Sequence, residues 1–342
     1  MGEEDLMYLR TLLPAAAGAL WLALSGGTAQ AAAAAGPGPA APIHCPRTCM
    51  EGIVDQYLAA MVRHDPSGLP LSKGVRFTEN TADIRLGEGL WVGASEVPST
   101  FKVYVVDPAS SQVAFYGVMK ERGQPVQLVL RLKLINGRIT EVEHVVARGV
   151  RPSAMEYLTT PRPGFLADVP AAERNTREEM INAADNYFEA IERNDGSVAP
   201  FARDCERHEN GMQTTGHKTP TPWPVPLGSP EADRGMAQIG MLGCAAQLDT
   251  GVMAFITRLW PRRLDVVDEQ KGLVMSFPLF NHRGGSGAVP IKGVAGVASL
   301  PLGGGASTMQ MGELFKVRGG ELHEIEAVGM TLPYGSKSGW ED

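Results

Sequence analysis

Apolar residues recur every three or four positions in two well-separated segments, which predicts amphipathic helices over about residues 48–64 and 176–191. Each segment opens with a threonine followed three residues later by a glutamate, the pattern of a helix capping box. The two pairs are Thr48 with Glu51 and Thr176 with Glu179. The first helix should end near His64, because Asp65 and Pro66 follow it.

Alternation of apolar and polar residues predicts strands after each helix. In the first half, the expected strands are 75–79, 101–106, 113–120, 126–135 and 139–147. In the second half, they are 204–210, 252–260, 263–267, 273–280, 310–317 and 321–329, and a further helix should start near residue 232. Asn136 and Gly137 form a strong hairpin signal between two of these strands. Glu79 shares a strand face with Val75 and Phe77, so it should point into the core.

The outline of the first half returns in the second half. Six residues recur 130 positions later: Asp55, Tyr57, Asp65, Pro70, Glu79 and Asn80 match Asp185, Tyr187, Asp195, Pro200, Glu209 and Asn210. A second set of matches, between 133–143 and 316–326, is offset by 183. The second copy should therefore contain an insertion of about fifty residues. Two copies of one unit, helix first and hairpin last, indicate a tandem duplication.

A helix followed by a mainly antiparallel sheet, without strand–helix–strand alternation, indicates an α+β fold in which a curved sheet wraps each helix. With 342 residues and 44% hydrophobic content, the chain can build two ordinary cores. The expected division is a signal peptide at 1–31, a disordered spacer at 32–44, unit 1 at 45–150, a linker at 151–175, and unit 2 with its insertion at 176–342.

The N-terminus has the pattern of an export signal. Residues 6–24 are largely apolar, and Ala29 and Ala31 provide the small residues of a cleavage site, so we expect a secreted or periplasmic protein. No later apolar run is long enough to span a bilayer, and we expect no membrane association of the mature form. The net charge of −7 and the absence of a lysine and arginine cluster argue against nucleic acid as a partner.

In an oxidising compartment the four cysteines should pair, and three pairings are open. We favour Cys205 with Cys244, which would tie the insertion to the first strand of unit 2, and Cys45 with Cys49 across the first helical turn. No Cys-x2-Cys or His-x3-His spacing accompanies them, so we expect no metal site.

Segments 57–65 and 187–195 each place a tyrosine eight residues before an aspartate, and each helix is followed by a strand with an acidic residue. In these residues the chain resembles NTF2-like (SnoaL-like, ketosteroid isomerase-like) proteins. The resemblance implies two cone-shaped, cystatin-like units, each enclosing a cavity. The mature chain is also similar to an uncharacterised secreted family of fungi and bacteria. This similarity does not indicate any particular activity. That likeness lies in 205–211, 243–248, 262–263 and 333–340.

In ketosteroid isomerase, a tyrosine and a protonated aspartic acid stabilise an enolate while another carboxylate moves the proton. The resemblance implies that Tyr57 and Tyr187 match the oxyanion-binding tyrosine. The proton-moving carboxylate would fall at one of two repeated pairs, Glu79-Asn80 and Glu209-Asn210. The aspartate of the family aligns about as well with the asparagine as with the glutamate. A shift of one residue along a strand reverses the face, so this choice matters.

Structural roles compete with these chemical ones. A tyrosine on an apolar helix face is often a core residue. Each repeated glutamate could accept hydrogen bonds from the backbone or from Arg76 and Arg207. The glutamates of the terminal strands are expected to face solvent: Glu141, Glu143, Glu324 and Glu326. A serine hydrolase has little support, because no Gly-x-Ser-x-Gly motif occurs.

Asymmetry between the copies favours unit 2 as the active one. His208 adjoins Glu209, and the insertion adds candidate lid or pocket residues, namely His217, Trp223 and His282. Unit 1 has fewer polar residues near Glu79 in the sequence, which suggests a scaffold half.

Two hypotheses follow. The first is a cofactor-independent lyase, isomerase or hydrolase acting on a hydrophobic small molecule, such as an aromatic or polyketide-like compound. The second is a non-catalytic protein that binds such a ligand. The sequence leaves open whether the protein forms a homo-oligomer.

Overall fold

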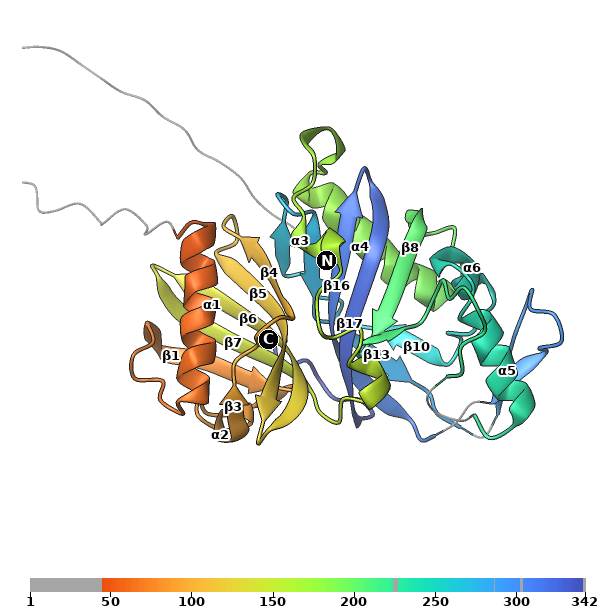
Figure 1. Ribbon diagram of the computed structural model, residues 1–342, viewed down its shortest axis with the longest axis horizontal. Coiled ribbons are helices and arrows are strands. Elements are labelled where there is room, and N and C mark those ends of the chain that lie inside the picture. The colour runs from red at the N-terminus through yellow and green to blue at the C-terminus, as the bar shows by residue number, and fades with distance from the viewer. Residues whose placement is uncertain (1–44, 224–226, 286, 302–303, 341–342) are drawn as a thin grey trace, which may run out of the picture. The chain divides into compact units, whose positions relative to one another are not determined.

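The computed structural model describes residues 45–223, 227–285, 287–301 and 304–340 (Figure 1). The predicted signal peptide and spacer, residues 1–44, lie outside these ranges and stay predictions.

In unit 1, helix α1 (Arg47–Val62) packs on a sheet with strand order β2-β1-β7-β6-β5-β3, and β4 pairs with β5. Strands β1 and β7 run parallel, and the other pairs are antiparallel. The other elements of this unit are β1 (Leu71–Glu79), β2 (Ala82–Asp83), α2 (Leu90–Gly93), β3 (Ala94–Glu96), β4 (Lys102–Asp107), β5 (Gln112–Glu121), β6 (Gln124–Ile135) and β7 (Arg138–Ala147).

Unit 2 repeats this plan around α4 (Arg177–Arg193), with strand order β10-β13-β16-β17-β8-β9 and β12 joining β11 to β16. Its strands are β8 (Phe201–Glu209), β9 (Met212–Gln213), β10 (Ile256–Leu259), β11 (Val266–Asp268), β12 (Leu273–Ser276), β13 (Leu279–His282), β16 (Ser307–Arg318) and β17 (Glu321–Pro333). The insertion contributes α5 (Pro230–Ile239) and α6 (Cys244–Asp249), and the glycine-rich region forms the small hairpin of β14 (Ala288–Pro290) and β15 (Ser299–Pro301). The α+β fold class, with one long helix against each sheet, is thus confirmed.

The sheet registers reproduce both sequence offsets. In each unit the first strand runs parallel to the last strand, with an irregularity at the same place. The equivalent pairs are Leu71 with Ile139, Phe201 with Leu322, Glu79 with His144, and Glu209 with Ala327. The strands that carry the repeated Glu-Asn pairs therefore occupy the same place in both sheets.

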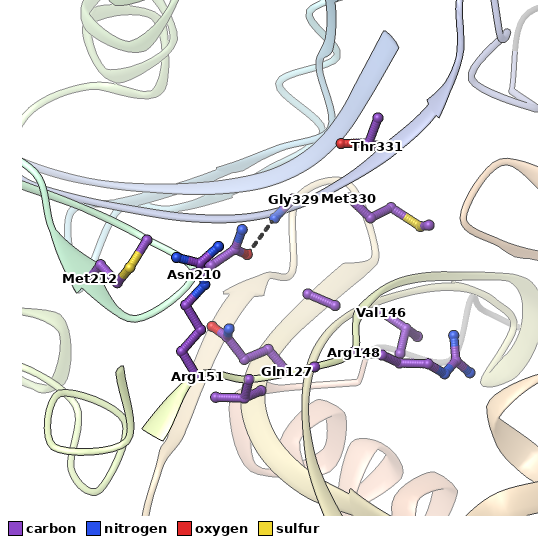
Figure 2. Close-up of a pocket in the computed structure, with 12 residues that line it drawn as sticks. Gln127, Val146, Arg148, Arg151, Asn210, Met212, Gly329, Met330 and Thr331 are labelled. Carbon is purple, nitrogen blue, oxygen red and sulfur yellow. Dashed lines mark hydrogen bonds between the residues drawn. The ribbon is translucent and has the colours of Figure 1, made fainter. Parts of the chain in front are cut away.

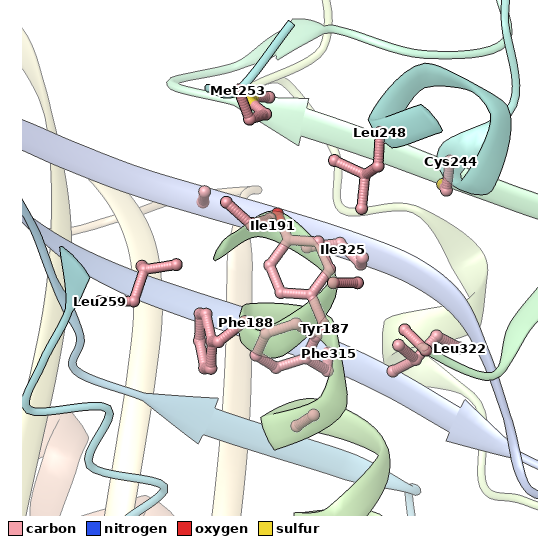
Figure 3. Close-up of a cluster of buried hydrophobic side chains, with 14 of the residues drawn as sticks. Tyr187, Phe188, Ile191, Cys244, Leu248, Met253, Leu259, Phe315, Leu322 and Ile325 are labelled. Carbon is pink, nitrogen blue, oxygen red and sulfur yellow. The ribbon is translucent and has the colours of Figure 1, made fainter. Parts of the chain in front are cut away.

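The apolar face of each long helix fills its own sheet. Figure 3 shows Tyr187, Phe188 and Ile191 of α4 against Phe315 and Ile325 of the sheet. These five side chains are all nearly fully buried. Burying a side chain of this size contributes roughly 1.5–3 kcal/mol. The capping box predicted at Thr176 and Glu179 is present and starts α4.

The opposite faces of the two sheets share a third core. It contains Val129 and Val145 of unit 1 and Leu314 and Val328 of unit 2. A Cβ atom on Gly312 would lie 2.8 Å from Val129, so glycine permits this close approach. The linker covers an edge of this core with the buried residues Ala154, Leu158 and Phe165, from η1 (Pro152–Ala154), the following turn and α3 (Pro163–Leu166); η2 (Ala171–Glu173) leads into α4.

Both predicted disulfides are present. Cys45 bonds Cys49, and Cys205 bonds Cys244, which joins β8 to α6. No described helix is long and apolar enough to cross a membrane.

Two local predictions are wrong. The capping box at Thr48 and Glu51 does not form, because α1 starts earlier, at Arg47, within the turn closed by the first disulfide. The expectation that the terminal-strand glutamates face solvent also fails, since this face meets the other sheet and the linker. Glu143 and Glu326 are buried there, paired with arginines: Arg131 and Arg263 contact Glu143, and Arg162 contacts Glu326.

Candidate functional site

Unit 2 contains two adjoining cavities between α4, the insertion and the sheet. The inner one has a volume of about 140 Å³ and the outer one about 250 Å³. Both are lined by Trp223, Met236, Val252, Phe255 and His282. Most of these shared walls are apolar, so the pair forms a hydrophobic space with defined polar points.

The polar groups gather at the inner cavity. Tyr187 of α4, Arg207 and Glu209 of β8, and Glu313 of β16 all line it. Arg207 donates to the Tyr187 hydroxyl at 3.4 Å and lies 3.4 Å from the Glu209 carboxylate. Two further bonds, to Thr214 at 3.1 Å and Gln247 at 2.8 Å, fix the buried guanidinium in place.

Glu313 is the most perturbed acid of this site. It is 1% exposed, and its Oε2 atom has no hydrogen-bond partner within the described residues. Burial raises the pKa of Glu313 to about 8, assisted by the charge of Glu209 and opposed by Tyr187 and Arg207. At neutral pH this carboxyl is therefore mainly protonated and can donate a hydrogen bond.

Two further groups are tuned by burial. Burial raises the pKa of Tyr187 well above its usual value, and the charge of Glu313 adds to the effect. Burial also lowers the pKa of His282, which Glu209 opposes. The site thus holds a neutral phenol and a neutral imidazole at neutral pH.

The other predicted residues of unit 2 lie elsewhere. His208 points to the opposite face of β8 from Arg207 and Glu209, where it contacts Glu206 at 2.6 Å. Alternation along the strand explains this, and the expectation that His208 adjoins the reacting group is not met. Asn210 also lies outside this cavity, since it adopts a left-handed turn (φ 48°) and accepts a bond from the Gly329 N–H. His217 bonds the Gln213 carbonyl at 3.0 Å and lines a separate hollow.

In unit 1 the equivalent residues form a buried chain. Tyr57 contacts His144 at 2.9 Å and accepts from the Trp91 indole at 2.9 Å, and His144 lies 3.5 Å from Glu79. Burial alone would raise the pKa of Glu79, but His144, the Leu90 N–H and an arginine, Arg148, outweigh it and lower the pKa to about 2.

Asn80 is a turn residue like Asn210, with φ 51°. The expectation of few polar groups near Glu79 is wrong, because His144 and Arg148 come from distant β7 and the residue just after it. Tyr57 and Trp91 are essentially fully buried, and neither lines one of the cavities discussed here. Among the described residues of unit 1, side chains therefore pack directly around the Tyr57 hydroxyl.

Sequence reasoning missed Glu313 and His144, although a signal existed for both. Met309, Met311, Glu313 and Phe315 alternate onto one strand face, so a charged residue stood in an apolar row. His144 likewise stands among apolar positions of β7. A polar residue at an inward position is the informative exception in such a row.

A model of a domain of unknown function (DUF8021) matches residues 173–329, which span unit 2 from just before α4 into β17. No curated protein matches the sequence significantly. Among solved structures, the chain is similar to AclR from Streptomyces galilaeus, described as "a putative hydroxylase". That likeness has 18% identity and a TM-score of 0.20, covers 37% of this chain and 92% of AclR, and carries no argument about activity.

Proposed function

We propose that unit 2 is an acid–base catalyst that binds a hydrophobic small molecule carrying a carbonyl group. The observation that carries this proposal is the placement of Tyr187, Glu209 and the protonated Glu313 around one largely apolar cavity. Such a set offers a proton acceptor and two hydrogen-bond donors without any cofactor.

The chemistry follows from these positions. The Glu209 carboxylate takes a proton from a carbon next to the substrate carbonyl, and the C–H electron pair moves into an enolate. The Tyr187 and Glu313 hydroxyl groups donate to the enolate oxygen as its charge develops. Return of the proton to another carbon gives isomerisation, and loss of a leaving group gives elimination, so the substrate decides between isomerase and lyase.

The remaining contacts support a specific geometry. Arg207 holds Tyr187 and Glu209 on either side of its guanidinium, so both face the same space. Apolar walls at Val252, Phe255 and Trp223 exclude water from a bound ring system. A hydrophobic, aromatic or polyketide-like substrate suits these walls.

The test is proton exchange, which needs no knowledge of the natural substrate. The purified chain from residue 45 onward is incubated in D2O with 2-tetralone, and NMR follows deuterium entry beside the carbonyl. Glu209→Gln should slow exchange by about 10²–10⁴-fold, as for loss of an acid–base group. Tyr187→Phe should lower kcat more than it raises KM, since its bond strengthens as charge develops.

Glu206→Gln is the matched control, because Glu206 lies on the same strand but on the opposite face and should leave exchange unchanged. His208→Ala should also leave it unchanged. Exchange that survives Glu209→Gln but fails in Glu79→Gln would contradict the assignment to unit 2. Binding of 2-tetralone without any exchange would instead favour the non-catalytic binding protein.

We also propose that the protein is exported after removal of residues 1–31. Two disulfides support an oxidising compartment. Mass spectrometry of the protein from culture medium should give a mature N-terminus near residue 32, and an intact Met1 would contradict this.

A further inference from the structure

A separate cavity of about 370 Å³ lies where the two sheets meet (Figure 2). Its walls come from β6 and β7, from residues 148–151 after β7, from the turn after β8 and from β9, and from β17. Val146, Met212 and Met330 provide an apolar part. The volume falls within the range of small-molecule pockets, roughly 300–1,000 Å³.

One hydrogen-bond donor in this cavity is the amide of Gln127. This residue is 1% exposed, and its Oε1 atom accepts from the Tyr116 hydroxyl at 2.6 Å. Its Nε2 group has no acceptor within the described residues. A buried amide that lacks an acceptor is costly unless a ligand or water supplies one.

A second donor is Asn210, and its repeat partner shows what is missing. In Asn80, Oδ1 accepts from the Val146 N–H at 2.8 Å and Nδ2 donates to the Val146 carbonyl at 3.2 Å. In Asn210, Oδ1 accepts from the Gly329 N–H at 2.9 Å, but Nδ2 has no acceptor in the described part of the chain.

The third donor is Arg151. Its guanidinium forms no ion pair with any described residue, whereas Arg148, the other arginine of the wall, is held by Glu79 and Glu121. Figure 2 shows Gln127, Arg151 and Asn210 on one side of the cavity, with the end of Arg148 pointing away from them. The lining includes no carboxylate from the described residues.

We propose that this cavity is a binding site for a small organic carboxylate. The carboxylate accepts hydrogen bonds from Gln127, Asn210 and Arg151, and the apolar body lies against Met212 and Met330. Charge-assisted bonds to a guanidinium are the stronger ones, and a partly enclosed site strengthens them further. This inference does not depend on the catalytic proposal, because the two cavities share no lining residue.

The test is a titration of the purified protein with benzoate, with benzamide as a neutral probe of similar shape and inorganic phosphate as an anion without an apolar body. Methyl resonances of labelled methionines give the location, since Met212 and Met330 line this cavity while Met309 and Met311 line the inner cavity of unit 2. Benzoate should shift Met212 and Met330, and benzamide should bind at least tenfold more weakly.

Arg151→Gln should weaken benzoate binding by about tenfold or more, the effect of losing one charged hydrogen bond. Arg151→Lys should retain part of the affinity, and Arg203→Gln, at an exposed arginine without a described partner, should bind as the wild type does. No benzoate binding, shifts confined to Met309 and Met311, equal binding of phosphate, or an unchanged affinity in Arg151→Gln would each overturn the assignment.

Discussion

Glu313 shows how one buried carboxyl links the site to stability. Its pKa is raised to about 8 in the folded protein, compared with 4.5 for an ordinary glutamate. Between these two values the folded state holds a proton that the unfolded state has released. The contribution of Glu313 to the free energy of unfolding is therefore fully present below about pH 4.5 and is lost as the pH rises toward 8.

We predict that the unfolding free energy falls between pH 5 and pH 8, and that Glu313→Gln flattens this fall. The difference in slope should be at most about 1.4 kcal/mol per pH unit. Burial also raises the pKa of Glu324 and Glu326, so part of the slope should remain in the variant. Denaturant unfolding at several pH values measures it. Glu96→Gln, at an exposed residue, should keep the wild-type slope, and an identical slope in Glu313→Gln would refute the assignment.

The repeated asparagines are conformational residues. Asn80 and Asn210 both adopt positive φ, and each side chain accepts a bond from the last strand of its unit. We predict that Asn210→Ala lowers the unfolding free energy by about 2–3 kcal/mol, through left-handed strain and a lost hydrogen bond. Asn210→Gly should lose less, because glycine tolerates this conformation. Equal losses in the two variants would contradict the conformational role.

At the scale of elements, the disulfides differ in what they constrain. Cys205 and Cys244 are separated by 39 residues, and Cys45 and Cys49 by 4. On the loop-entropy model, the disulfide that closes the long loop should raise the free energy of unfolding by about 4 kcal/mol. The disulfide that closes the short loop should raise it by about 2 kcal/mol. We predict this order for paired Cys→Ser variants in denaturant unfolding. A larger loss from the short loop would show that local packing, not chain entropy, dominates.

Periodicity predicted the long helices and the strands of unit 1 close to their observed ranges, although β5 and β6 are buried on both faces. It failed where a proline interrupts an apolar run: the predicted strand 273–280 is divided into β12 and β13 at Phe277 and Pro278. The short α2 and α6 are held by tertiary contacts and have too few turns to show a period.

The site could be predicted only in part, because repeat matching finds only the residues that the two units share. Repeat matching found Tyr187 and Glu209, which line the cavity of unit 2. It could not find Glu313, because the equivalent position 183 residues earlier is Leu130. Nor could it separate His208 from Glu209, since only the strand face distinguishes adjacent residues.

At the scale of the whole molecule, the units contact each other reciprocally, as subunits of a two-fold dimer do. Asp107, at the end of β4, accepts from the Val267 N–H at 3.1 Å and pairs with Arg177 at 2.7 Å. Asp268, at the end of β11, accepts from the Val106 N–H at 3.1 Å and pairs with Arg47 at 2.5 Å. The two aspartates are 161 positions apart, between the offsets of 130 and 183, so repeat matching did not connect them.

This reciprocity predicts that the two units unfold together. Asp107 and Asp268 are each 1% exposed, so removing either leaves a strand N–H and a half-buried arginine without their acceptor. Asp107→Ala and Asp268→Ala should each cost about 1–3 kcal/mol, the usual effect of leaving a buried N–H without its acceptor. Calorimetry should show one transition, shifted to lower temperature in both variants, while Asp83→Ala, at an exposed residue, leaves it unchanged. Two transitions, with only one shifted, would mean that each unit is stable without the other.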